Sequence, residues 1–325
     1  MTDANKGKKS FLSFLKRFLF MDEFMILVVL IALCAAMSIL TDRFLTMTNI
    51  MNVLRQISTV GITATGLAFV IMTGGMDLST GSIISIGGMT LAFLYTHGVN
   101  IYLALLLALL LGAVIGSING MIIMRFSLNP FVVTLATSYI IKGFSYLYTQ
   151  GMPVSFTGTP INYLGSGYLF GKIPMMAVCM IVVLIIGHIV LTKTPYGKYV
   201  LAVGGNMKAA ELSGLPVVAI RVIAYAMVGV LASFSGVLYT CNLNMADSAT
   251  GIGYETNILA AVVIGGTPLG GGKGTIFGVF IGAAIMGIIK NAFVLLNIST
   301  YWQYISIGAI ILIAIMSERL KKVRY

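Results

Sequence analysis

The chain of 325 residues is 58% hydrophobic and only 9% charged, with a mean hydropathy of +1.01. Because a soluble domain carries about 25% charged residues, this composition excludes a soluble protein and indicates an integral membrane protein. The net charge of +11 indicates basic cytoplasmic loops, where Lys and Arg collect in membrane proteins, and no nucleic-acid partner is expected.

The N-terminal segment, residues 1–23, is basic and precedes the first apolar run. Within it, "SFLSFLKRFLF" alternates Phe and Leu with Ser and Lys at near-helical spacing, which predicts a cytoplasmic or interfacial segment along the membrane surface. The apolar run 24–40 is too long for a typical signal-peptide core and lacks a convincing cleavage site. We therefore predict that it is a retained first span.

Apolar runs recur along the whole chain at close to the about 20 residues that a membrane-crossing helix needs. The eighth run is too short to cross alone, so it either completes a span with its neighbours or enters the membrane as a half-helix that stops at the glycines after it. The basic residues place both termini in the cytoplasm. The predicted fold is an all-α polytopic membrane protein, a single permease domain over 1–325 with about ten transmembrane helices, some broken or re-entrant. The predicted spans are 24–40, 50–72, 79–96, 101–124, 130–149, 174–192, 218–241, 255–266, 275–296 and 301–317.

Two connections are long enough to be more than turns. The segment 150–173 is predicted to be a periplasmic loop and 193–217 a cytoplasmic one. Within the latter, "NMKAAELSG" predicts a short helix, because Asn206 is a good N-cap and Gly214 a good terminator. We interpret this helix as a surface that touches a partner; the simpler alternative is that it only caps a loop.

The stretch "GGMDLSTG" (74–81) separates two apolar runs with paired glycines and a carboxylate. Paired glycines break a helix, and non-helical backbone is tolerated at membrane depth only where protein or a cavity surrounds it. Asp77 either caps the next helix through the free amides of Ser79 or Thr80, or contacts a permeant or a gate. The later "GGTPLGGG" (265–272) shares the pattern GG-x-x-L-x-x-G, and transporters often have broken helices at matching positions.

Ionisable residues inside membrane spans are functional candidates, because each costs at least ~2.5–3.5 kcal/mol there. Asp77 and Glu255 lie in or beside mid-chain breaks. Lys142 lies within a span, where snorkelling to the outer interface is an equal explanation. The sequence has no phosphate-binding loop, no HExxH and no GxSxG. We therefore expect no catalytic residues, no metal and no cofactor, and a chain that is not an enzyme.

Four segments occur in one order along the chain: "GGMDLSTGS" (74–82), "NPFVVTLATSYIIKG" (129–143), "TPYGKYVLAVGGNMKAAELSGLPV" (194–217) and "GIGYETNILAAVVIGGTPLGGGKGTIFG" (251–278). Together they resemble the ribose-type permeases, the membrane subunits of bacterial ATP-binding-cassette (ABC) sugar importers. The similarity runs from about 50 to 317. The chain departs from the family pattern at Thr80, Lys142, Thr256 and Asn257, where Val, Arg, Leu and an acid are common.

The resemblance implies a permease that moves a monosaccharide, ribose or a related sugar, from periplasm to cytoplasm across the inner membrane. It implies three partners: ABC ATPase subunits, a periplasmic or lipid-anchored sugar-binding protein, and a second permease copy or a paralogous permease. The expected translocation-pathway residues are Gly74, Gly75, Asp77, Ser79, Thr80, Asn119, Thr134, Lys142, Glu255 and Asn257. The expected ATPase-coupling residues are Gly205, Asn206, Ala209, Ala210, Leu212 and Gly214.

Other functions remain open at this stage. The same architecture could import nucleosides or branched-chain amino acids, and Asp77 with Lys142 could form a charge pair for an amino acid. An ion-coupled secondary transporter could use the same groups and Glu255 as a relay. The neutral hydrogen-bonding groups of "TLATS" (134–138) and of Asn119 favour a sugar.

Overall fold

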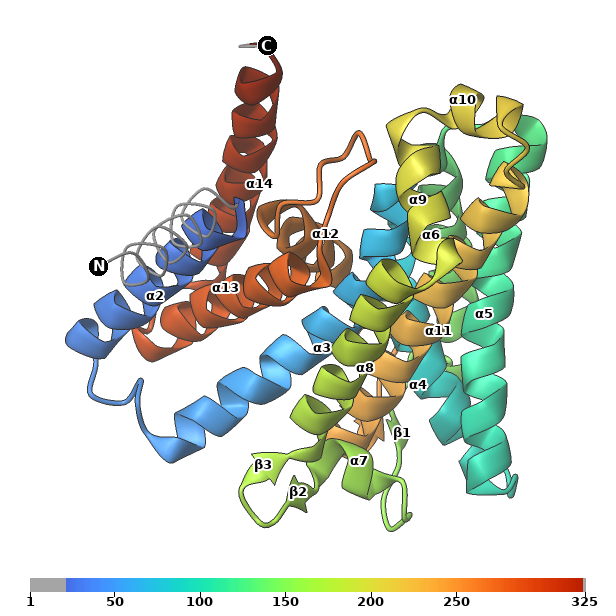
Figure 1. Ribbon diagram of the computed structural model, residues 1–325. Helices are drawn as coiled ribbons and strands as arrows, with labels where there is room; N and C mark the ends of the chain where they lie inside the picture. Colours follow the sequence, from blue (N-terminus) through green and yellow to red (C-terminus); the bar gives the residue numbers. More distant parts are fainter. Residues whose placement is uncertain (1–21, 324–325) are drawn as a thin grey trace, which may run out of the picture.

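The computed structural model describes residues 22–323, which are almost entirely helical (Figure 1). The predicted N-terminal segment, apart from its last two residues, lies outside this range. The helices are α2 (Asp22–Leu40), α3 (Met47–Met72), α4 (Thr80–Thr96), α5 (Ile101–Phe126), α6 (Pro130–Thr149), α7 (Asn162–Ser166), α8 (Met175–Lys193), α9 (Pro195–Gly205), α10 (Met207–Leu212), α11 (Val217–Leu243), α12 (Tyr254–Ile264), α13 (Ile276–Leu295) and α14 (Thr300–Val323). The strands are β1 (Val154–Ser155), β2 (Tyr168–Leu169), β3 (Ile173–Pro174) and β4 (Met245–Ala246).

Each apolar run predicted as a span contains one helix of the described chain: α2 to α6, α8, and α11 to α14. Five of them, α3, α5, α8, α11 and α13, are long and apolar enough to cross a membrane by length and composition. The all-α polytopic fold is therefore confirmed. Helix α12 has 11 residues and is about 16 Å long at 1.5 Å per residue, about half of the hydrocarbon thickness, so the helix in the eighth run is too short to cross the membrane alone.

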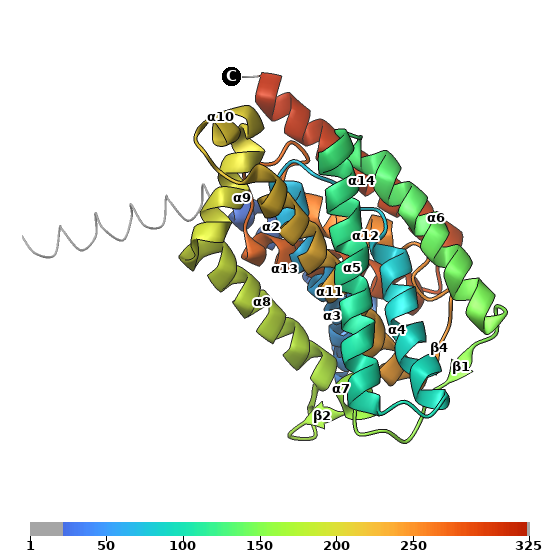
Figure 2. The same ribbon diagram turned by 90° about the vertical axis from the view of Figure 1, so that its right-hand side faces the viewer.

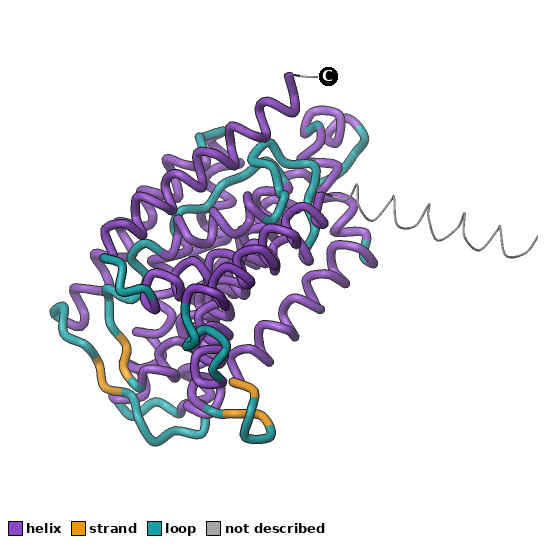
Figure 3. Tube along the Cα trace, turned by 90° about the vertical axis from the view of Figure 1, so that its left-hand side faces the viewer, coloured by secondary structure: helices purple, strands orange, loops and turns teal. Residues whose placement is uncertain are grey.

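The long helices run between two ends of the molecule. We call them the α10 end and the hairpin end, the second being defined by the antiparallel strands β2 and β3. Figures 1 and 2 show β2 at the end opposite α10, and Figure 3 shows the strands away from the C-terminal end of α14. Helix α2 begins at the α10 end, where Phe24 lines a cavity together with Thr192 and Lys198. Helix α14 ends at the same end (Figures 1 and 2).

Both long connections contain more structure than the sequence analysis predicted. The segment 193–217 holds two helices, because α9 precedes the predicted helix α10. Thr194 caps α9 by accepting from the Gly197 amide at 3.5 Å, and Pro195 occupies its first turn. In the segment 150–173, β1 pairs with β4, matching Val154 to Ala246, so this segment is attached to the end of α11.

Helix α11 lies at the centre of the molecule and packs against α3, α4 and α5. The approach of α5 is close enough that a Cβ on Gly112 would stand 2.7 Å from the Ser233 Cβ, nearer than real side chains come. Only glycine fits at such a contact, in line with the small residues that allow membrane helices to meet through their backbones. This central group holds the end of α3 and the start of α4, where the predicted break lies.

Candidate functional site

The chain between α3 and α4 is a true helix break, formed by residues 73–79. Gly74 has a φ of +76°, a left-handed conformation that favours glycine. The amide of Gly75 then returns to the Val70 carbonyl at 3.0 Å. A Cβ on Gly75 would stand 2.9 Å from the Tyr225 hydroxyl. The two glycines therefore differ in their structural roles. Gly74 allows the left-handed turn of the backbone, and Gly75 allows Tyr225 of α11 to lie close to the break.

Asp77 lies inside the break and is 1% exposed. Its Oδ1 accepts hydrogen bonds from the Ser79 amide at 2.7 Å and from the Ser79 hydroxyl at 2.6 Å. This carboxylate thus holds the residue that precedes α4 in a local turn of the kind that Asp side chains form with the amide two residues on. Its Oδ2 is buried with no hydrogen-bond partner in the part of the chain that the structure describes. Of the two amides that the sequence analysis named, those of Ser79 and Thr80, the Asp77 side chain accepts from that of Ser79.

A buried polar network extends from Asp77 to two further helices. The Asn119 Nδ2 of α5 donates to the Ser79 hydroxyl at 3.0 Å, and its Oδ1 accepts from the Thr137 hydroxyl of α6 at 2.6 Å. Both Asn119 and Ser79 are fully buried. Because a buried amide is costly unless it is paired, this arrangement fixes α4, α5 and α6 to one another at the break.

Helix α6 supplies further hydroxyl groups to the same region. The Thr134 hydroxyl accepts from the Leu78 amide at 3.1 Å and donates to the Pro130 carbonyl at 2.8 Å. One turn later, Ser82 and Ser138 hydroxyls meet at 3.1 Å. The polar side chains of "TLATS" thus contact the break and the first turn of α4.

The start of α12, which contains the predicted pathway residues Glu255 and Asn257, lies against the N-terminal part of α4. The Gly251 amide donates to the Ser85 hydroxyl at 2.8 Å, and a side chain on Gly81 would overlap the Glu255 carboxylate. The Glu255 Oε2 is buried and, among the described residues, has no hydrogen-bond partner. Asn257 bonds within its own turn, from Nδ2 to the Gly253 carbonyl at 2.9 Å.

The two similar glycine-rich segments also meet. The Gly272 amide donates to the Met72 carbonyl at 2.9 Å, and a Cβ on Gly271 would stand 2.7 Å from the Gly74 amide nitrogen. The pattern shared by 74–81 and 265–272 therefore marks two stretches of backbone that pack together beside the break.

Two predicted pathway residues make no contact of this kind. The Lys142 Nζ lies 5.7 Å from the centre of the Tyr139 ring on its own helix, and Lys142 forms no charge pair with Asp77. The Thr80 hydroxyl is buried but has no hydrogen-bond partner within residues 22–323.

Sequence reasoning missed two residues of α11 that border the break. Tyr225 is fully buried, and its hydroxyl donates to the Met76 carbonyl at 3.0 Å and accepts from the Met76 amide at 3.3 Å. Arg221 is 7% exposed and lies one turn earlier. A signal for Arg221 existed, because it is a charge within the predicted span 218–241; Tyr225 gives no comparable signal.

The predicted coupling helix is present as α10. The Asn206 Oδ1 accepts from the Ala209 amide at 2.9 Å, and Gly214, with a φ of +80°, follows the end of the helix. Ala210, however, is 6% exposed and belongs to the hydrophobic core of this chain, whereas Leu212 is 82% exposed. Ala209 and Gly205 are exposed. The outward face of α10 therefore includes Ala209 and Leu212 but not Ala210.

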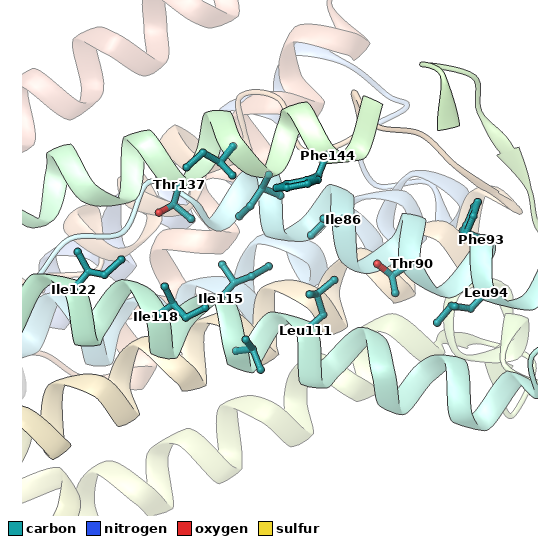
Figure 4. A pocket seen from close by; sticks show the side chains of 13 residues that line it. Ile86, Thr90, Phe93, Leu94, Leu111, Ile115, Ile118, Ile122, Thr137 and Phe144 are labelled. Carbon is teal, nitrogen blue, oxygen red and sulfur yellow. The ribbon is translucent and has the colours of Figure 1, made fainter. Parts of the chain in front are cut away.

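A cavity of about 590 Å³ lies between α4, α5 and α6 (Figure 4). Its lining is apolar except for Thr90 and Thr137. The hydroxyls of a sugar would find almost no partners there, and buried polar groups need partners. Buried hydrogen-bonding side chains are concentrated instead around the break.

Residues 49–315 match the family model described as the permease component of the branched-chain amino acid transport system. This range contains the break, the helix α10 and the start of α12.

The names of individual relatives specify a sugar, unlike the description of the family model. The chain is 42% identical to the ribose import permease of Bacillus subtilis, over 90% of this chain and 91% of that protein. It is 38% identical to the ribose import permease of Escherichia coli K12, over 91% and 93%. It is 36% identical to the L-arabinose transport system permease of the same strain, over 93% and 92%.

No solved structure matches the chain significantly. The family match and the relatives cover nearly the same residues as the motifs quoted from the sequence. The chain therefore belongs to the family of branched-chain amino acid transport system permease components, and its resemblance to the ribose-type permeases is confirmed.

Proposed function

We propose that this multi-pass protein of the bacterial inner membrane is the permease subunit of an ABC importer for a monosaccharide, ribose or a related sugar. The observation that carries the proposal is the similarity, over about nine-tenths of the chain, to permeases named for ribose and L-arabinose. The neutral hydrogen-bonding groups at the break agree with it, because Ser79, Asn119 and Thr134 can bind sugar hydroxyls without a fixed charge.

The orientation that we propose has ten crossings with both termini in the cytoplasm. The α10 end would be cytoplasmic and include 193–217, and the hairpin end would be periplasmic and include 150–173. Support comes from α2 beginning and α14 ending at the α10 end, as an even number of crossings requires. The basic residues Lys193, Lys198 and Lys208 lie at this end, which fits the positive-inside rule.

Separate ABC ATPase subunits would supply the energy, since the sequence has no phosphate-binding loop of its own. In this proposal they bind the outward face of α10, where Leu212 presents an unpartnered apolar side chain. A periplasmic or lipid-anchored sugar-binding protein would deliver the solute at the hairpin end.

The proposed assembly contains a second permease, either a copy of this chain or a paralogue. Helices α6 and α14 lie on one side of the molecule in Figure 2. Both carry large exposed apolar side chains, such as Tyr139 and Phe144 on α6 and Trp302 and Ile305 on α14. The break and the start of α12 lie near this side, so the two permeases would enclose the translocation pathway between them.

Branched-chain amino acids form the second candidate class, because the family model carries their name. Such a solute needs partners for its ammonium and carboxylate groups. Lys142 contacts Tyr139 rather than Asp77, so the charge pair that the sequence suggested does not exist in this state. This difference favours the sugar.

The test is reconstitution of the chain in liposomes with its ATPase subunits and binding protein, followed by uptake of labelled ribose with and without ATP. We expect uptake that depends on ATP and on every component. Uptake by the chain alone, driven by an ion gradient, would refute the importer. Titration of the binding protein with pentoses, hexoses, nucleosides and amino acids decides the solute class, and tight binding of an amino acid alone would overturn the sugar.

A further inference from the structure

Arg221 is a buried cation without a carboxylate partner. Its Nη1 lies 3.3 Å from the Met124 Sδ at the end of α5 and 3.7 Å from the Met207 Sδ, the first residue of α10. Its Nε is buried and has no hydrogen-bond partner in the described chain. Thioether sulfur is a weak acceptor, and a buried charge with weak partners reduces stability. Stability alone therefore gives no reason for an arginine here.

One turn further along α11, Tyr225 connects this arginine to the break. The Tyr225 hydroxyl holds both backbone polar groups of Met76, the residue before Asp77. Arg221 and Tyr225 are four residues apart on α11, which makes their side chains neighbours on one face of the helix. A series of neighbouring residues thus runs from α10 through Arg221 and Tyr225 to the backbone of the break.

The same series contains two buried charged atoms without partners. They are the Arg221 Nε and the Asp77 Oδ2. Tyr225 follows Arg221 by one turn of α11 and bonds to Met76, the residue before Asp77. Release of Met76 by Tyr225 would allow the guanidinium and the carboxylate to pair directly. Such a pair would give the region a second set of contacts beside the one observed, which is what a structural element needs in order to switch.

We propose that Arg221 and Tyr225 are positioning residues that transmit a displacement of α10 to the break at residues 73–79. In the state described here, Tyr225 holds Met76 and Arg221 contacts the two methionines. When α10 moves Met207, Arg221 leaves its sulfur contacts and pairs with Asp77, and the break changes its conformation. The inference rests on the proposed function in one respect, since it takes α10 to be the element that the ATPase displaces.

Two substitutions test the link in the reconstituted complex. Tyr225→Phe removes only the hydroxyl, and Arg221→Met replaces the cation with a third methionine. We expect each to lower ribose uptake per ATP hydrolysed about tenfold, the effect of losing one or two buried hydrogen bonds. Arg221→Met should at the same time keep or raise the melting temperature, because it removes a buried charge. The matched control is Tyr239→Phe on the same helix, which keeps its ring contact with Tyr254 and should leave the ratio unchanged.

The double variant shows whether Arg221 and Tyr225 act in one series or affect transport independently of each other. If both residues act in one series, Tyr225→Phe with Arg221→Met should be no worse than either single variant. Multiplied losses, or a normal uptake ratio in either single variant, would overturn the proposal.

A measurement that does not involve the solute can test the role of Tyr225 even if the proposed sugar is wrong. After replacement of Cys34, Cys179 and Cys241, a cysteine is introduced by Leu78→Cys and its alkylation rate is measured with and without the ATPase subunits. We expect the ATPase to change that rate in the otherwise native chain but not with Tyr225→Phe. A response with Tyr225→Phe equal to that of the native chain would overturn the link. A native chain that responds to the ATPase but imports no ribose would overturn only the sugar assignment.

Discussion

Ser79 and Asn119, forty residues apart in sequence, form a fully buried side-chain hydrogen bond of 3.0 Å between the start of α4 and the middle of α5. The same amide accepts from Thr137 of α6 at 2.6 Å. The position of the helix break therefore depends on side chains of three helices and not only on its own glycines.

Asn119→Ala should lower both stability and transport. Loss of the amide leaves the Ser79 and Thr137 hydroxyls without these partners, at a cost of about 1–3 kcal/mol. Thermal unfolding in detergent and ribose uptake by the complex measure the two effects. The control is Asn291→Ala, which breaks the buried Asn49–Asn291 pair away from the break and should lower stability with little change in uptake. Equal loss of uptake in both variants would show that the network has no special role.

Asp77 is expected to act in folding as an acceptor for Ser79 and in transport through its charge. Asp77→Asn keeps an oxygen that can accept from Ser79, so it should fold normally, but it cannot form an ion pair with Arg221 and should lose most of its uptake. Asp77→Ala also removes the acceptor and should in addition lower the free energy of unfolding by about 1 kcal/mol. Thermal unfolding in detergent and ribose uptake by the complex measure the two effects. Normal uptake by the Asn variant would show that the charge is not required and would contradict the pairing with Arg221.

Gly251→Ala should prevent stable folding. A Cβ there would overlap the Gly81 carbonyl, and forcing such a contact costs about 3 kcal/mol. Gly143→Ala on α6 is the matched control, since its Cβ would meet nothing within 4 Å and alanine favours a helix by about 0.5–1 kcal/mol. The yield of monodisperse protein after detergent extraction distinguishes them.

Two exposed positions at opposite ends of the molecule test its orientation. Phe170 is 88% exposed beside the β2–β3 hairpin, and Leu212 is exposed on α10. On a cysteine-free background, a membrane-impermeant thiol reagent should label Phe170→Cys in intact spheroplasts and Leu212→Cys only after permeabilisation. The reverse pattern would invert the proposed topology.

Leu212→Asp should weaken binding of the ATPase while leaving the permease folded, because the side chain is exposed and has no apolar partner in this chain. Co-purification of the ATPase with each variant measures this. Ala210→Leu is the informative contrast: Ala210 faces the hydrophobic core, so this larger side chain should lower thermal stability by about 1–3 kcal/mol. Normal co-purification of the ATPase with Leu212→Asp would show that the ATPase does not bind this face of α10.

The spans were predictable because hydropathy and helix length are local properties. The break at 74–81 and the limits of α10 followed from glycines and a cap residue in the same way. The face of α10 that is exposed did not follow, since six residues are too few to show a periodic pattern. Helix α9 could have been predicted from Thr194 and Pro195, which form a standard helix start.

Contacts between distant segments were not predictable from one sequence. Three features depend on how the helices pack: the pairing of β1 with β4, the hydrogen bond of Tyr225 to Met76, and the separation of Lys142 from Asp77. The repeated glycine pattern was a partial exception, because its two copies do lie together, although the pattern itself gives no reason for contact.

The short helix α12 has a consequence for how the protein is made. Its 11 helical residues cover about half of a bilayer, and the preceding backbone depends on α4 for a partner, as the bond from Gly251 to Ser85 shows. Lipid offers no substitute for such a bond. This part of the nascent chain can therefore settle in the membrane only after α4 has emerged from the ribosome and inserted. The later half of the polypeptide thus folds against a surface that the earlier half provides.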